Sequence, residues 1–286
     1  MTGSYSQDPV TVGPGAEDIG GLIGLNNAGT IDQSYATGNV MGGESDVGGL
    51  VGLNETNSTI ENSYATGAVV AQLGTKIGTE GVGVGGLVGE NQAIDGEALI
   101  VDSYATGAVK GNDEVGGLVG VNDSGAQIET SEATGNVTAT ADPAVVGDGT
   151  DAGGLVGLAS GTISNVYATG KVSGYNDVGG LIGFADSGLT VSQAYSIGVA
   201  SASDPSSPSL GASVGLSAGA TLTDVYWDST TDPTLNGIGS VVGADTTMSL
   251  TTKQLRSGLP AGFSAAVWGS NKSIDGGLPY LLALQE

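Results

Sequence analysis

Val47-Gly48-Gly49-Leu50-Val51-Gly52 is the stretch that decides the fold, because it recurs along most of the chain. A repeat of this kind cannot bury its own apolar side, so it must stack on copies of itself. The recurring block is Gly-Gly-Leu-(Val/Ile)-Gly. It begins at Gly20, Gly48, Gly85, Gly116, Gly153 and Gly179, with a weaker seventh copy at Gly211.

A second block follows each first one, and in the first repeat it reads Ser34-Tyr35-Ala36-Thr37-Gly38-Asn39-Val40. A lone apolar position such as Ile31 lies between the two blocks, and Gly, Asn, Asp and Ser separate all three. Each repeat therefore offers two or three short strands. Stacked in parallel at about 4.8 Å, seven coils give a rod roughly 34 Å long.

The predicted fold is an all-β parallel β-solenoid of about seven coils, with a right-handed β-helix favoured. Residues 18–228 form the stack. Residues 1–17 are expected to be an N-terminal cap or incomplete coil. Residues 229–286, which lack the pattern, are expected to form a C-terminal cap over the open edge of the last coil.

Charge and composition exclude several classes of function. The chain has 286 residues, 30 of them acidic and 6 basic, for a net charge of −24. This charge repels nucleic acid and anionic membranes. The chain has no Cys and no His, which removes thiolate and imidazole catalysis and the usual zinc ligands. No apolar run is long enough to insert in a membrane, and the first residues do not resemble a signal peptide.

Two stretches carry a family resemblance: Val47 to Gly52, and Asn62-Ser63-Tyr64-Ala65-Thr66-Gly67. They resemble the GLUG repeat of bacterial surface proteins, including filamentous-haemagglutinin-like adhesins. The resemblance implies a secreted or cell-surface module without catalytic residues, acting in adhesion or as a rigid stalk. It also implies a partner, which would be a cell-surface glycan, a protein or other domains of a longer parent chain. Self-association is left open.

Alternation in the second block predicts which side chains face water, because successive residues of a strand point to opposite faces. A Lys in the column of Asn39, and Glu132 in the column of Tyr35, indicate that this parity is exposed. The residues expected on the exposed face form a candidate binding surface. They are Tyr35, Tyr64, Tyr104, Tyr167 and Tyr195, beside Thr37, Thr66, Thr106, Thr134 and Thr169. Packing between like residues on adjacent rungs is the structural alternative.

Carboxylates recur two positions before the first block. They are Asp18, Asp46, Glu114, Asp151 and Asp177. Stacked at about 4.8 Å they repel one another, and Ca²⁺ bound between coils would relieve this repulsion. The alternative is that these residues form turns and solvent screens their charges. Calcium is the only cofactor that the sequence suggests.

Other features leave further alternatives open. A polysaccharide-acting lyase or hydrolase would use paired carboxylates, and an ice-binding solenoid would use a flat Thr column. Asn26, Asn54, Asn91 and Asn122 share one offset and are expected to stack at a corner. Both parities of the first block are apolar, so its Leu column is either covered by loops or free to self-associate. Insertions at 70–83, 92–98, 138–151 and 200–210 are expected to hold specificity.

Overall fold

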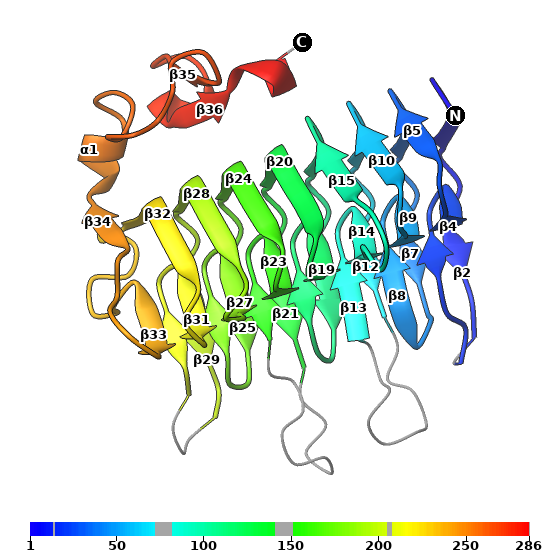
Figure 1. The fold of residues 1–286 in the computed structure, drawn as a ribbon, viewed down its shortest axis with the longest axis horizontal. Helices are drawn as coiled ribbons and strands as arrows, with labels where there is room; N and C mark the ends of the chain where they lie inside the picture. The colour runs from blue at the N-terminus through cyan, green and yellow to red at the C-terminus, as the bar shows by residue number, and fades with distance from the viewer. Residues whose placement is uncertain (14, 72–81, 141–150, 205–207, 286) are drawn as a thin grey trace.

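A computed structural model of the protein describes residues 1–13, 15–71, 82–140, 151–204 and 208–285. Strands stack in parallel along the rod, and each pairs with its equivalent in the coil before and after (Figure 1). The predicted parallel β-solenoid is therefore confirmed. Parts of three predicted insertions, residues 72–81, 141–150 and 205–207, lie outside the described residues, and the role of the insertions in specificity remains a prediction.

Each coil contributes strands to four sheets in turn. The tyrosine sheet has twelve strands: β1 (Tyr5–Ser6), β5 (Thr30–Asp32), β6 (Tyr35–Ala36), β10 (Ser58–Glu61), β11 (Tyr64–Ala65), β15 (Ala98–Val101), β16 (Tyr104–Ala105), β20 (Ala126–Ala133), β24 (Thr162–Ala168), β28 (Thr190–Ser196), β32 (Thr221–Asp228) and β34 (Met248–Leu250). The second sheet has seven: β2 (Val10–Thr11), β7 (Val40–Met41), β12 (Val69–Val70), β17 (Val109–Gly111), β21 (Val137–Ala139), β25 (Val172–Gly174) and β29 (Ala200–Ala202).

The other two sheets are built from the first block, on either side of its glycine pair. The third sheet has seven strands: β3 (Ile19–Gly20), β8 (Ser45–Gly48), β13 (Val82–Gly85), β18 (Val115–Gly116), β22 (Ala152–Gly153), β26 (Val178–Gly179) and β30 (Leu210–Gly211). The fourth has eight: β4 (Ile23–Asn26), β9 (Val51–Asn54), β14 (Val88–Asn91), β19 (Val119–Asn122), β23 (Val156–Ala159), β27 (Ile182–Ala185), β31 (Val214–Ser217) and β33 (Ile238–Val241).

Equivalent residues of successive repeats lie directly opposite one another. Tyr64 pairs with Tyr35 on one side and with Tyr104 on the other. Ile60 pairs in the same way with Ile31 and Ile100, although these repeats differ in length. Columns of equivalent side chains are therefore real features of the surface and the core.

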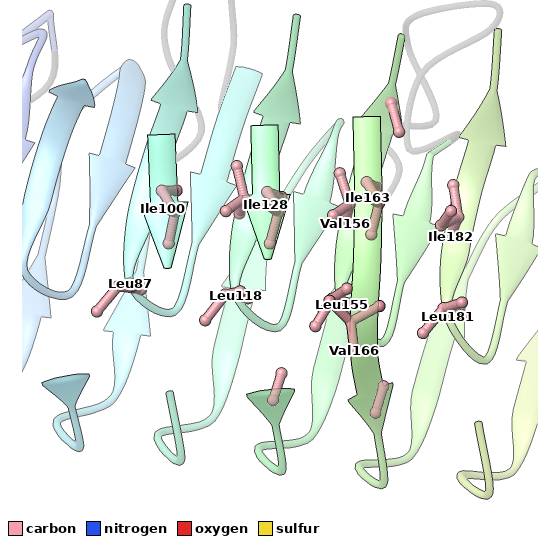
Figure 2. Packing of buried hydrophobic residues seen from close by; sticks show 14 of the residues in the cluster. Leu87, Ile100, Leu118, Ile128, Leu155, Val156, Ile163, Val166, Leu181 and Ile182 are labelled. Carbon is pink, nitrogen blue, oxygen red and sulfur yellow. The ribbon is translucent and has the colours of Figure 1, made fainter. Parts of the chain in front are cut away.

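The Leu column of the first block belongs to the core, so both expectations for it were wrong. The chain bends between the third and fourth sheets at the glycine pair, and Leu50 and Val51 are both fully buried. Such a bend turns two successive side chains to the same side, which a straight strand does not allow. Figure 2 shows this packing for Leu87, Leu118, Leu155 and Leu181 beside the isoleucine column.

The Asn column forms the expected corner ladder. Asn26 donates from Nδ2 to Oδ1 of Asn54 at 2.8 Å, Asn54 donates to Asn91 at 2.8 Å, and Asn91 donates to Asn122 at 2.9 Å. All four side chains are buried. Buried amides that satisfy one another in this way tie adjacent coils together in register.

The last residues differ from the expected cap. Strands β33 and β34 pair with β31 and β32 and extend the stack beyond the seventh coil. The chain then turns back through a C-terminal segment, defined as residues 251–285, which holds α1 (Thr252–Leu255), β35 (Trp268–Ser270), η1 (Asp275–Gly277), β36 (Pro279–Leu281) and η2 (Leu282–Gln285). Figure 1 shows this segment lying beside β32, β28 and β24, and not across the end of the rod. At the other end, β1 and β2 stack on β6 and β7 as an incomplete coil.

Candidate functional site

The outer side of the tyrosine sheet, called here the tyrosine face, carries a column of tyrosine rings. Tyr35 and Tyr64 have ring centroids 4.9 Å apart and planes 2° apart, and Tyr64 and Tyr104 lie 4.8 Å and 4° apart. Tyr5 extends the column at 5.2 Å from Tyr35. Rings that stack in this way cover one another's faces, so the column presents ring edges and hydroxyl groups to its surroundings.

The alternation predicted for the second block matches the structure. Thr37, Thr66, Thr106 and Thr134 are exposed, and Thr169 is half-buried. The opposite parity, which holds Ser34, Ala36, Gly38 and Val40, is buried. Hydroxyl groups therefore flank the tyrosine column from Tyr35 to Tyr167.

The tyrosine column is exposed along only part of its length, which corrects the prediction of a single exposed surface. Tyr35, Tyr64 and Tyr104 are half-buried, and Tyr5 is 60% exposed. In contrast, Tyr167 and Tyr195 are only 3% and 0% exposed. The C-terminal segment covers them together with Tyr226, through Phe263, Trp268 and Leu281. The tyrosine face thus has an open half, at Tyr5, Tyr35, Tyr64 and Tyr104, and a covered half, at Tyr167, Tyr195 and Tyr226.

The covered tyrosines hold the C-terminal segment through their hydroxyl groups. Tyr195 donates to the backbone carbonyl of Pro279 at 2.7 Å, and Tyr226 donates to that of Ala261 at 3.0 Å. The ring of Trp268 lies 6.0 Å from that of Tyr167 and 5.9 Å from that of Tyr195, tilted by 46° and 50°. The contact therefore combines aromatic packing with hydrogen bonds to the segment's backbone.

A second column, missed by sequence reasoning, lies two residues before the tyrosine column, in which Glu132 takes the place of one tyrosine. Its members have positive φ, from 44° to 54°, and are Gln33, Asn62, Asp102, Thr130, Asn165, Gln193 and Asp224. Asn and Asp tolerate this left-handed conformation better than most residues, and their recurrence at one offset was the available signal. In the covered half, Asn165 Oδ1 accepts a hydrogen bond from Trp268 Nε1 at 3.1 Å. Gln193 Oε1 accepts one from the backbone N–H of Ser264 at 3.2 Å.

The two halves differ in charge at one register position. Asp32, Glu61 and Val101 occupy this position in successive rungs of the open half, and Glu129 occupies it in the next rung. Ser164, Ser192 and Thr223 occupy it in the covered half. At this position the rungs under the C-terminal segment are therefore uncharged, and the rungs left open are mostly acidic.

Glu132 marks the boundary between the halves, because it stands between Tyr104 and Tyr167 in the column. Burial, reinforced by the charge of Asp275, raises the pKa of Glu132 from 4.5 to about 7, although a hydrogen bond with Tyr167 opposes the shift. Its Oε2 atom is buried without a hydrogen-bond partner. A buried carboxylate in such surroundings is costly, so the site favours the protonated acid.

Glu132→Gln is expected to remove part of the pH dependence of stability. A native pKa above the unfolded value means that the native state binds the proton more tightly. The stabilisation that the proton on Glu132 gives the native state is complete below pH 4.5 and is lost as pH rises through about 7. At pH 8 the variant should be more stable than the native chain by about 3 kcal/mol. Urea unfolding at pH 5 and pH 8 measures this. Glu129→Gln, on the outer face of the same strand, is the control. If the free energy of unfolding changes between pH 5 and pH 8 by the same amount in Glu132→Gln as in the native chain, the raised pKa does not belong to Glu132.

The acidic column does not form a metal cluster in the described chain. Asp18, Asp46 and Glu114 have positive φ near 50°, as the turn alternative requires. Asp46 hydrogen-bonds with Glu90, and burial raises the pKa of both carboxyl groups. Asp151 and Asp177 are buried and hydrogen-bonded to each other. Within the described ranges no three acidic side chains are grouped so as to hold a metal ion. Calcium binding by this column remains a prediction. A proton held between two neighbouring carboxyl groups, such as those of Asp46 and Glu90, would also reduce their repulsion.

Two comparisons bear on the identity of the chain. The family model described as the GLUG motif matches residues 15–41, 43–70, 111–138 and 148–173. GLUG motifs are therefore present in this chain. The third coil is not matched, yet β13 to β17 stack in the same register, so the fold extends beyond the recognised motifs.

A relative also matches. Over 166 residues the chain is 32% identical to Halomucin from Haloquadratum walsbyi (strain DSM 16790 / HBSQ001), a match that covers 57% of this chain and 1% of that protein. No solved structure matches the chain. The resemblance to filamentous-haemagglutinin-like adhesins gains no support from these matches. Among the described residues, no helix has the length and apolar character needed to cross a membrane.

Proposed function

We propose that this chain is a rigid, non-catalytic repeat module of a secreted or cell-surface protein, and that it attaches to a partner through the open half of its tyrosine face. The GLUG motifs and the match to a protein named Halomucin support the surface role. The continuous register of the coils supports rigidity, because each coil is fixed by the next through backbone hydrogen bonds and the Asn ladder.

One observation carries the proposal for attachment. The protein covers one half of the face with its own C-terminal segment and leaves Tyr35, Tyr64 and Tyr104 accessible. Tyr supplies a large contact area and a polar tip while losing little conformational freedom, and it is enriched in binding surfaces. The exposed Thr column beside it adds hydroxyl groups that bond to polar partners.

The test is binding of the full chain to cells and to an array of glycans and surface proteins. Tyr35→Ala, Tyr64→Ala and Tyr104→Ala combined should weaken binding by about tenfold or more. The control combines Met41→Ala and Lys110→Ala, two exposed positions on the second sheet. Equal loss in both variants, or unchanged binding in the triple variant, would leave the chain with a spacing role alone.

A further inference from the structure

The covered half of the tyrosine face shows what kind of ligand fits this surface. Its occupant is a protein segment, and two tyrosine hydroxyls, of Tyr195 and Tyr226, donate to carbonyl groups of its backbone. The occupant inserts one large aromatic side chain, Trp268, which is 1% exposed and packs on two tyrosine rings. Each of the three residues of positive φ beside these tyrosines also touches the segment, and the carboxylate of Asp224 lies against Gly262.

Three rungs of the open half carry the same arrangement of side chains. Gln33, Asn62 and Asp102 stand two residues before Tyr35, Tyr64 and Tyr104, as Asn165, Gln193 and Asp224 stand before Tyr167, Tyr195 and Tyr226. Each half therefore offers two amides and one carboxylate beside three tyrosines. The spacing is also the same, since Tyr64 and Tyr104 stack at 4.8 Å and Tyr167 and Tyr195 at 4.9 Å. A segment that fits one half finds equivalent acceptors and hydroxyl donors in the other.

The ring geometry favours a peptide over a sugar. Pyranose rings bind aromatic side chains by lying on an open ring face, but Tyr35, Tyr64 and Tyr104 stack nearly parallel with ring centroids 4.9 and 4.8 Å apart, which leaves no room for a sugar between them. What these rings present is their edges and a row of hydroxyl groups. In the covered half, the hydroxyls of Tyr195 and Tyr226 donate to peptide carbonyls, and that of Tyr167 donates to the carboxylate of Asp275 at 3.5 Å.

Charge distinguishes the ligand of the open half from the protein's own segment. Asp32, Glu61 and Glu129 replace the serine and threonine side chains of the covered half. Asp32 Oδ1 accepts a hydrogen bond from Asn62 Nδ2 at 3.0 Å, which joins this acidic strip to the column of positive φ. A ligand lying here brings its own groups within a few ångströms of carboxylates, so positive charge is favoured and negative charge is opposed.

We infer that the open half of the tyrosine face binds a cationic segment of a partner protein that carries a large aromatic side chain. The inference rests on the proposed function, because it names the partner of the same surface. The partner's backbone carbonyls accept from the hydroxyls of Tyr35, Tyr64 and Tyr104. Its Lys or Arg side chains meet Asp32 and Glu61, and its aromatic ring packs on the tyrosine edges as Trp268 does on the covered half.

The experiment uses the full chain, whose own segment keeps the covered half occupied, and two synthetic peptides. One has the sequence of residues 259–282, and the other is the same peptide with Asp275→Lys. The lysine peptide should bind about tenfold more tightly, and Tyr64→Ala in the protein should weaken its binding by about tenfold. Asp32→Asn combined with Glu61→Gln should bring the two peptides to similar affinity. The control, Glu17→Gln with Asp95→Asn, removes two exposed charges outside this face and should leave the preference unchanged.

Several outcomes would overturn the inference. Equal binding of the two peptides to the native chain would show that the acidic strip does not select charge. Equal loss of preference in the control would show non-specific attraction to a chain of charge −24. Glycans that bind in a Tyr64-dependent way while both peptides fail would also overturn it, yet would leave the proposed function standing. Unfolding midpoints of the Tyr64→Ala chain distinguish lost binding from lost fold, and Tyr64→Phe, which keeps the ring, tests the hydroxyl alone.

Discussion

Gly86→Ala is expected to prevent the third and fourth coils from stacking. A Cβ atom at residue 86 would lie 2.1 Å from the carbonyl oxygen of Gly117 and 3.0 Å from Cβ of Ala105. Neither neighbour is the end of a flexible side chain, so the backbone of one coil must move away from the next. The same contact recurs from Gly49 to Gly86 and from Gly117 to Gly154, at 2.1 and 2.0 Å. The second glycine of the block is therefore fixed by the close approach of two coils at a corner.

The free energy of unfolding of Gly86→Ala should fall by more than about 4 kcal/mol, a loss typical of serious backbone conflict. Urea unfolding followed by circular dichroism measures it, since the parallel sheets dominate the signal. Gly13→Ala is the matched control, because no atom lies within 4 Å of an added Cβ there. A Gly86→Ala chain as stable as the Gly13→Ala chain would show that the corner has room that the structure does not give it.

The sequence was sufficient to predict the solenoid and its columns. Repetition at Gly48 and Gly85 makes every local preference act at the same place in each coil, so the isoleucine and Asn columns follow directly from the alignment of repeats. The Leu50 column was misread because alternation assumes a straight strand. The bend at Gly49 places two neighbouring residues in the core, and only the corner geometry shows this.

The covered half of the tyrosine face could not be predicted in the same way. Tyr195 bonds to Pro279 and Asn165 to Trp268, pairs separated by 84 and 103 residues, and the C-terminal segment has no repeat to align. The sequence did show that large aromatic residues gather near Phe263 and Trp268. A cap was the simplest interpretation, because the open edge of a stack must be protected. In the structure β33 and β34 become the last strands of their sheets, and the aromatic residues cover tyrosines on the side of the rod instead.

Trp268→Ala is expected to release the C-terminal segment from the tyrosine face while the stack stays folded. Trp268 is 1% exposed, and it contacts Phe263 at a centroid distance of 4.5 Å as well as the two tyrosine rings. Removing a buried indole of this kind costs about 3–5 kcal/mol. The hydrogen bond to Asn165 is lost as well. These contacts belong to the cluster between the C-terminal segment and the tyrosine face, which is separate from the Leu–Ile core inside the coils. The substitution should therefore weaken the packing of the segment on the face and leave the core of the coils intact.

Hydrogen exchange should therefore become fast in residues 251–285 and at the covered strands β24, β28 and β32, while the strands of the first three coils keep their protection. Leu282→Ala, at a 41% exposed position of the same segment, should leave exchange unchanged. Release of the segment would also expose Tyr167, Tyr195 and Tyr226, together with the uncharged side chains of Ser164, Ser192 and Thr223 in the same rungs. The variant should then bind the unmodified peptide of residues 259–282 at these rungs, whereas the native chain keeps them occupied. If exchange instead rises evenly along the whole rod, the segment and the stack unfold as one unit and the face has no separable halves.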